Sequence, residues 1–145
     1  MTRVAVLTPD PSDPSYASQW PGVLARLSEG LTAAGLSVHA TPWTEHVDSL
    51  EGLKGFDLIL PVITWGYYND HPLWLRACAL WEASGLDFAN PARVIAWNSD
   101  KTYLARLAVK GITIPPTVFT DDVTPQAIEA AFAQFSASSL IVKPT

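Results

Sequence analysis

The stretch Asp57-Leu58-Ile59-Leu60-Pro61-Val62-Ile63 is apolar at almost every position after its first residue. A short, continuous apolar run of this kind is typical of a strand that is covered on both faces of a parallel sheet. Two earlier segments, Arg3–Leu7 and Ser37–Trp43, also have the composition of strands and end at turn residues. Together the three segments predict a buried parallel sheet.

Helical patterns lie between these strands. One apolar stripe begins after Pro21 and stops at Gly35, and another begins at Pro72 and stops at Gly85. Proline favours the first turn of a helix, and glycine favours the position just after its end. A further short strand is expected at Leu86–Phe88. Strands that alternate with helices in this order predict an α/β fold with an open, doubly wound parallel sheet.

The loops that follow the strands of such a sheet line its ligand crevice. Here these loops are Thr8–Gln19, which is rich in Pro, Asp and Ser, and Thr64–His71, which is polar and aromatic. Asp10, Asp13 and Asp70 suit turns, and their place in the crevice loops also allows them to orient a substrate. The candidates for substrate contact are Asp10, Tyr67, Tyr68, Asn69 and His71.

Composition excludes several classes of protein. The chain has 145 residues, of which 48% are hydrophobic and 16% charged, so it is expected to fold around a core. Its net charge of -5 disfavours nucleic acid and anionic membranes as partners. The single Cys78 cannot form an internal disulfide, and no apolar run is long enough for a signal peptide or a membrane span. We therefore expect a cytoplasmic protein; homo-oligomerisation is left open.

The chain carries no glycine-rich dinucleotide or P-loop motif. His39, His46 and His71 lack the spacing of metal ligands, and we expect each to be a surface or loop histidine without a metal. Cys78 lies in a helical apolar pattern and is expected to pack in the core. These patterns identify no catalytic residue.

A change in composition near Asn90–Pro91 predicts a boundary between a domain of residues 1–91 and a segment of residues 92–145. In the second segment Asn98 or Ser99 suits the N-cap of a helix that would run to Gly111. Lys101 would then lie in the first helical turn, where it could hold a phosphate together with the free N–H groups.

The remaining elements of this segment are a strand at Thr117–Phe119, a helix beginning at Thr124-Pro125 and a strand at Leu140–Lys143. Lys143 would stand at the end of an otherwise apolar strand, either as a second phosphate ligand or as an edge charge that blocks aggregation. The segment offers little sheet to cover its apolar faces, which predicts that the chain is cut short.

Three motifs follow one another in this segment: Asn98-x-Asp100-Lys101, Gly111-x-x-x-Pro115-Pro116-Thr117 and Ile141-Val142-Lys143-Pro144. In this order they resemble the opening of the ATP-grasp superfamily, which includes glutathione synthetases, D-alanine–D-alanine ligases and biotin carboxylases. The resemblance implies a pre-ATP-grasp α/β domain followed by the start of an ATP-grasp nucleotide-binding lobe. It also implies that Lys101 and Lys143 bind the phosphates of ATP.

Members of this family use ATP and magnesium to activate a carboxylate as an acyl phosphate, which an amine then attacks. The resemblance thus implies a small-molecule carboxylate and an amine as substrates. The family's glycine-rich loop and magnesium ligands have no counterpart before Thr145. We therefore expect a fragment of a carboxylate–amine ligase that is inactive alone.

Two alternatives stay open from the sequence. The chain could be a stand-alone, flavodoxin-like module that binds a small molecule and carries both lysines as ordinary surface charges. It could also be a subunit that a partner chain completes.

Overall fold

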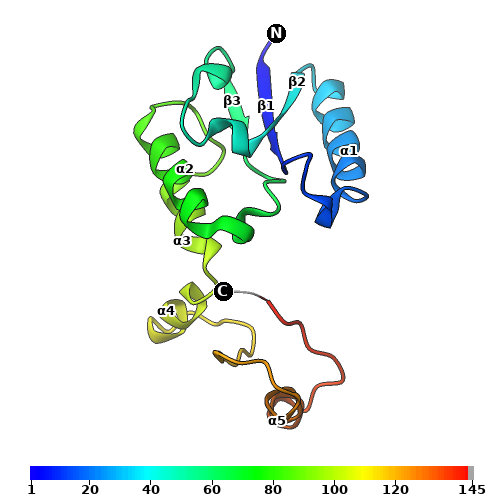
Figure 1. Ribbon diagram of the computed structural model, residues 1–145, viewed down its shortest axis with the longest axis vertical. Helices are drawn as coiled ribbons and strands as arrows, with labels where there is room; N and C mark the ends of the chain where they lie inside the picture. Colours follow the sequence, from blue (N-terminus) through cyan, green and yellow to red (C-terminus); the bar gives the residue numbers. More distant parts are fainter. Residues whose placement is uncertain (144–145) are drawn as a thin grey trace. The chain divides into compact units, whose positions relative to one another are not determined.

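The computed structural model describes residues 1–143 (Figure 1). The chain divides into two units, Met1–Trp97 and Asn98–Thr145, and each is described by itself. This division falls a few residues after the domain boundary expected at residue 91, and the assignment of residues 1–91 and 92–145 to domains stays a prediction.

The first unit contains a parallel three-stranded sheet. Its strands are β1 (Arg3–Thr8), β2 (Ser37–Pro42) and β3 (Leu58–Leu60), and they are ordered β2-β1-β3. An isolated parallel bridge between Ile59 and Phe88 extends the sheet beyond β3 where a strand was predicted. The open parallel sheet predicted from the apolar segments is therefore confirmed.

Helices cover both faces of this sheet, as Figure 1 shows. Val4 and Val6 of β1 pack on the side of α1 (Trp20–Ala33), while Ala5 and Leu7 pack on the side of α2 (His71–Ala83). Side chains of a strand alternate between its faces, and all four of these are fully buried. Burying each of the larger ones contributes about 1.5–3 kcal/mol. The doubly wound arrangement is confirmed.

Both predicted helix boundaries follow from local chemistry. Gly35 has a φ of 83°, and the Leu36 N–H donates to the Leu31 carbonyl oxygen at 3.1 Å, which closes the end of α1. At the start of α2, Asp70 Oδ1 accepts a hydrogen bond from the Leu73 N–H at 3.0 Å. This cap satisfies one of the amides that a helix start leaves without a partner.

A helix that the sequence did not predict, α3 (Ala92–Ser99), changes the place of the first lysine motif. It begins directly after Pro91, because Asn90 takes a φ of 76° and turns the chain, and Ala92 and Ile95 then pack on the core beside α2. Ser99 therefore ends a helix and does not cap one. The next helix, α4 (Tyr103–Val109), has Thr102 at its N-cap.

The strands predicted for the second unit do not form. Residues 117–119 and 140–143 pair with no other strand within the described chain, and Ile141 and Val142 are 84% and 63% exposed. A strand needs a neighbour for its backbone groups, and the described residues supply none. The predicted helix is present as α5 (Pro125–Phe135), where Thr124 Oγ1 accepts from the Ala127 N–H at 3.1 Å.

Four short 3₁₀ helices complete the first unit: η1 (Pro14–Tyr16), η2 (Trp43–His46), η3 (Glu51–Leu53) and η4 (Tyr67–Asp70). His46 in η2 is buried, which corrects the expectation of a surface or loop histidine. Its Nε2 lies 2.9 Å from Thr41 Oγ1, and burial lowers its pKa. Its backbone carbonyl oxygen accepts a hydrogen bond from the Trp81 indole N–H at 2.9 Å, which ties η2 to α2.

Candidate functional site

The order of the strands defines the place where a ligand crevice forms. From β1 the chain crosses through α1 to β2 on one side, and from β3 it continues through α2 toward Phe88 on the other. Connections that diverge in this way leave a crevice outside the carboxyl ends of the strands between them. The loops after β1 and β3 leave the sheet at this switch point.

A hollow of about 210 Å³ lies at this edge of the sheet. The loop after β1 contributes Asp10, Ser12 and Asp13 to its walls, and η2 contributes Trp43 and Thr44. The remaining lining residues follow β3: Trp65, Gly66, Asn69, Asp70 and Leu73. All of these residues belong to the first unit, so the hollow is complete within it.

Asp10 connects two of the loops around the hollow. Its Oδ1 accepts hydrogen bonds from the Ser12 N–H at 2.8 Å and the Ser12 hydroxyl at 2.7 Å. Its Oδ2 accepts from the Thr44 hydroxyl at 3.0 Å. Hydrogen bonding by Ser12, through its side chain first, holds the pKa of Asp10 below its ordinary value. The carboxylate is therefore ionised at neutral pH.

Asp13 forms a second connection, between the loops after β1 and β3. Its Oδ1 accepts from the Ser15 N–H at 2.9 Å, and its Oδ2 accepts from Asn69 Nδ2 at 3.1 Å. Ser15 lowers the pKa of Asp13, so this carboxylate is also charged. Gly66 has a φ of 86°, and a Cβ at this position would lie 2.7 Å from Asp13 Oδ2. Only glycine fits this approach without strain.

Of the predicted substrate contacts, the structure brings Asp10 and Asn69 to the walls of the hollow, together with Asp13 and Asp70. The lining does not include Tyr67, Tyr68 or His71. Tyr67 stacks on Trp74 with ring centroids 5.0 Å apart. The Tyr68 hydroxyl bonds to the Tyr16 hydroxyl, and this bond raises the pKa of Tyr68 to about 12. His71 is half-buried at the first position of α2.

The sequence prediction overlooked the wall that follows β2. Trp43 and Thr44 come directly after that strand, whose carboxyl end lies at the same edge of the parallel sheet. The sequence did predict the strand before Trp43. Because ligands bind beyond the carboxyl ends of parallel strands, the residues after this strand could also have been predicted to line the crevice.

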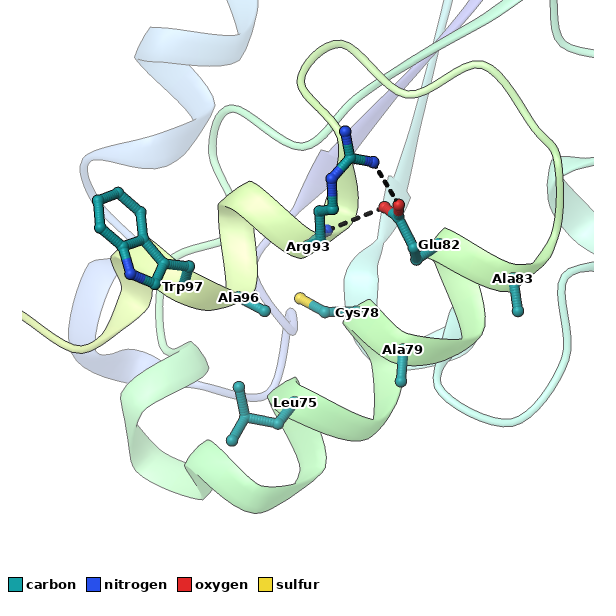
Figure 2. Close-up of a pocket in the computed structure, with 8 residues that line it drawn as sticks. All are labelled: Leu75, Cys78, Ala79, Glu82, Ala83, Arg93, Ala96 and Trp97. Carbon is teal, nitrogen blue, oxygen red and sulfur yellow. Dashed lines mark hydrogen bonds and ion pairs between the residues drawn. The ribbon is translucent and has the colours of Figure 1, made fainter. Parts of the chain in front are cut away.

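A larger hollow of about 640 Å³ lies between α2 and α3 (Figure 2). Its lining is mostly apolar, and its two charged residues pair with each other, as the Arg93 Nη1–Glu82 Oε1 distance of 2.5 Å shows. Burial raises the pKa of the Cys78 thiol on its wall to about 12, so this thiol is no nucleophile. The hollow lacks the convergent polar groups that orient a substrate.

The two lysines lie in the second unit. Lys101 is in the turn between α3 and α4, and its Nζ donates to the carbonyl oxygens of Asn98 at 3.2 Å and Ser99 at 3.3 Å. The C-terminal end of α3 is the negative end of its helix dipole, which favours the Lys101 ammonium group there. From the sequence we predicted Lys101 at the positive, N-terminal end of a helix. Lys143 is exposed and lies outside any strand. Pro144, the last residue of its motif, is outside the described residues.

No three His, Cys, Asp or Glu side chains among residues 1–143 are arranged to hold a metal ion. No helix within the same residues is long and apolar enough to cross a membrane.

No protein-family model and no curated protein matches the chain. Among solved structures, D-cycloserine synthetase DcsG is similar, with a TM-score of 0.60 and 23% sequence identity over 92% of this chain. The match covers 41% of DcsG, so the chain spans about two-fifths of that protein's length. At this level of identity the likeness shows a related α/β fold.

Proposed function

We propose that the chain is part of an ATP-dependent ligase that joins a carboxylate to an amine through an acyl phosphate. The observation that carries the proposal is the likeness of fold to a synthetase over 92% of the chain. The motifs at Lys101 and Lys143, which resemble those of ATP-grasp enzymes, point to the same class independently. In this proposal the hollow of the first unit binds a substrate and the two lysines bind the nucleotide.

The residues present suit part of this chemistry. Lysine ammonium groups are common ligands of phosphate oxygens. To reach a phosphate, Lys101 would exchange the Asn98 and Ser99 carbonyl oxygens for it, and Lys143 is already exposed. The described residues provide no set of ligands for magnesium, so we assign no step to this ion within the chain.

The second unit supports the idea of a longer protein. Val118, Phe119, Ile141 and Val142 are all more than two-fifths exposed, which is unusual for so many apolar side chains in one small unit. Further strands would cover them and pair the extended backbone. We therefore propose that catalysis needs protein beyond this chain, and that the chain alone is inactive.

The test uses the protein as its gene encodes it, with ATP affinity measured by calorimetry. Lys101→Ala and Lys143→Ala should each weaken ATP binding about tenfold or more, since each removes a charged hydrogen bond worth about 1.5–3 kcal/mol. Lys110→Ala is the matched control, because Lys110 is an exposed lysine of the same unit outside the motifs. Equal ATP affinity in all three variants and the parent protein would refute the proposal.

A second function, a stand-alone module that binds a small molecule, is favoured by one observation. The hollow at the sheet edge is built entirely from the first unit and needs no other part of the chain. The two functions differ in their dependence on nucleotide. Ligand binding without any ATP binding by the native protein would favour the module.

A further inference from the structure

Tyr16 and Tyr68 meet at the surface of the first unit. Tyr16 ends η1, in the loop after β1, and Tyr68 lies in η4, which follows β3. Their hydroxyl groups hydrogen-bond to each other, and their ring centroids are 6.5 Å apart in an edge-to-face arrangement. Tyr68 is 39% exposed and Tyr16 is half-buried, so a reagent in solution can reach the pair.

This contact brings together the parts of two phenols that couple when they are oxidised. A tyrosyl radical carries much of its unpaired electron on the Cε carbons, which are bonded to the carbon that bears the oxygen. Two such radicals combine through these carbons, and the two hydroxyl groups of the product stand side by side. The hydroxyl groups of Tyr16 and Tyr68 already stand in this relation. Side-chain and loop motions on a scale of about nanoseconds to microseconds close the remaining gap between the rings.

Neighbouring aromatic rings favour oxidation at these two tyrosines. The Trp65 ring lies edge to face with Tyr16, with centroids 5.2 Å apart, and Tyr67 lies edge to face with Tyr68 at 5.7 Å. A tryptophan radical oxidises a nearby tyrosine, because the tyrosine radical is the more stable of the two at neutral pH. Oxidation of Trp65 therefore ends at Tyr16. The single thiol of the chain competes poorly for the oxidant, since Cys78 is buried.

We propose that Tyr16 and Tyr68 form an oxidative modification site, at which hydrogen peroxide and a haem peroxidase convert the pair into an intramolecular dityrosine. Each phenol gives up one electron and its hydroxyl proton, and the two radicals form one bond between a Cε of Tyr16 and a Cε of Tyr68. Each ring then moves the hydrogen of its coupled carbon to its oxygen. The peroxide takes up the two electrons and two protons and becomes two molecules of water.

The cross-link joins the loops after β1 and β3 by a covalent bond. These loops supply two walls of the hollow at the sheet edge. The bond also closes a loop between residues 16 and 68, which lowers the conformational freedom of the unfolded chain. The cross-linked protein should therefore unfold at a higher urea concentration than the parent protein. The site lies within the first unit, and it does not depend on the proposed ligase activity.

The test treats the whole protein with a haem peroxidase and hydrogen peroxide and then digests it with trypsin. Cleavage after lysine and arginine leaves Tyr16 in residues 4–26 and Tyr68 in residues 55–76. A joined pair of these peptides should form, lighter than their sum by two hydrogen atoms, and fragment spectra should place the link at Tyr68 and not at Tyr67. The yield should not depend on protein concentration. No joined pair, or a link at Tyr67, would overturn the inference.

Phenylalanine variants keep the rings and remove single hydroxyl groups. Tyr68→Phe should lower the yield of the joined peptides about tenfold or more. Tyr67→Phe is the matched control, because this tyrosine lies on the same tryptic peptide, and it should leave the yield within about twofold of the parent protein. Equal yields in the two variants would show that Tyr68 is not the coupled residue and would contradict the inference.

Unfolded protein tests whether the fold selects the pair. Because urea inactivates the peroxidase, folded and urea-unfolded samples are compared with light, a ruthenium tris(bipyridine) complex and persulfate as the one-electron oxidant. Unfolding should lower the yield of the Tyr16–Tyr68 link about tenfold or more, while links to Tyr67 and Tyr103 increase. The same yield from both samples would refute the role of the hydroxyl contact.

Discussion

Asn69 Nδ2 donates a hydrogen bond of 3.1 Å to Asp13 Oδ2, and this bond joins two loops that are 56 residues apart in the chain. The loops leave neighbouring strands, β1 and β3, at the edge where the hollow forms. The Tyr16–Tyr68 hydroxyl pair joins the same two loops at a second point. The walls of the hollow are thus fixed by contacts between side chains as well as by the sheet.

Removing this bond should loosen the loops with little loss of stability. Asn69→Ala should lower the free energy of unfolding by less than about 1.5 kcal/mol, since the bond is exposed and neutral on one side. Backbone amides of residues 61–70 should exchange their hydrogens faster, while those of β1 keep their protection. Hydrogen exchange followed by mass spectrometry measures both. Unchanged exchange in the loop would show that the Tyr16–Tyr68 pair holds it alone.

A side chain at Gly66 should destabilise the fold. Gly66→Ala should destabilise the fold by about 1–3 kcal/mol from its left-handed backbone alone. The new Cβ would stand 2.7 Å from Asp13 Oδ2, so the Asp13 carboxylate must shift, and the cost of that shift adds to the loss. Urea unfolding gives the loss.

Gly35→Ala is the matched control for this change. Gly35 has nearly the same φ, 83° against 86°, but a Cβ there meets no atom within 4 Å. The extra loss at Gly66 therefore measures the contact with Asp13. Equal losses at the two glycines would show that Asp13 moves away without cost.

Stability should fall in mild acid because of His46. Burial lowers the pKa of this histidine in the folded state, so the unfolded chain binds a proton more readily. Stability from this group is therefore present above about pH 6.5, the ordinary histidine pKa, and is lost as the pH falls toward the folded-state pKa. Urea unfolding between pH 5 and pH 8 should show the slope. His46→Gln should remove it, and His39→Gln, at an exposed position, should leave it in place.

Cys78 should react with thiol reagents only after unfolding. Its side chain is buried, and burial raises its pKa to about 12, so the reactive thiolate is scarce at pH 8. Iodoacetamide should label the native protein far more slowly than the protein in urea, and the labelled fraction should follow the unfolding curve. Rapid labelling of the native protein would show that the space between α2 and α3 opens.

Several parts of the fold depended on local signals and could be predicted from the sequence. The apolar runs around Val6 and Ile59 predict the parallel strands because both faces of each are covered. Gly35, Asp70 and Thr124 mark helix ends because they satisfy backbone groups within a few residues. These interactions need no knowledge of the distant chain.

Other parts were decided by contacts between distant segments. Helix α3 forms because Ala92 and Ile95 find the core beside α2, and Lys101 therefore lies between the end of α3 and the start of α4 instead of inside the first turn of one longer helix. Residues 117–119 and 140–143 have the composition of strands but form none, because a strand exists only with a partner.

By itself, then, the sequence determined the class of the sheet, its order of strands and helices, and the loops that reach the crevice. Tertiary structure alone decided which side chains meet there: it selected Asp10, Asn69 and the wall at Trp43, and it turned Tyr68 toward Tyr16. The physical reason is the distance along the chain over which each interaction acts. Strand and cap signals act over a few residues, whereas the hollow is made by three loops that only the folded sheet brings together.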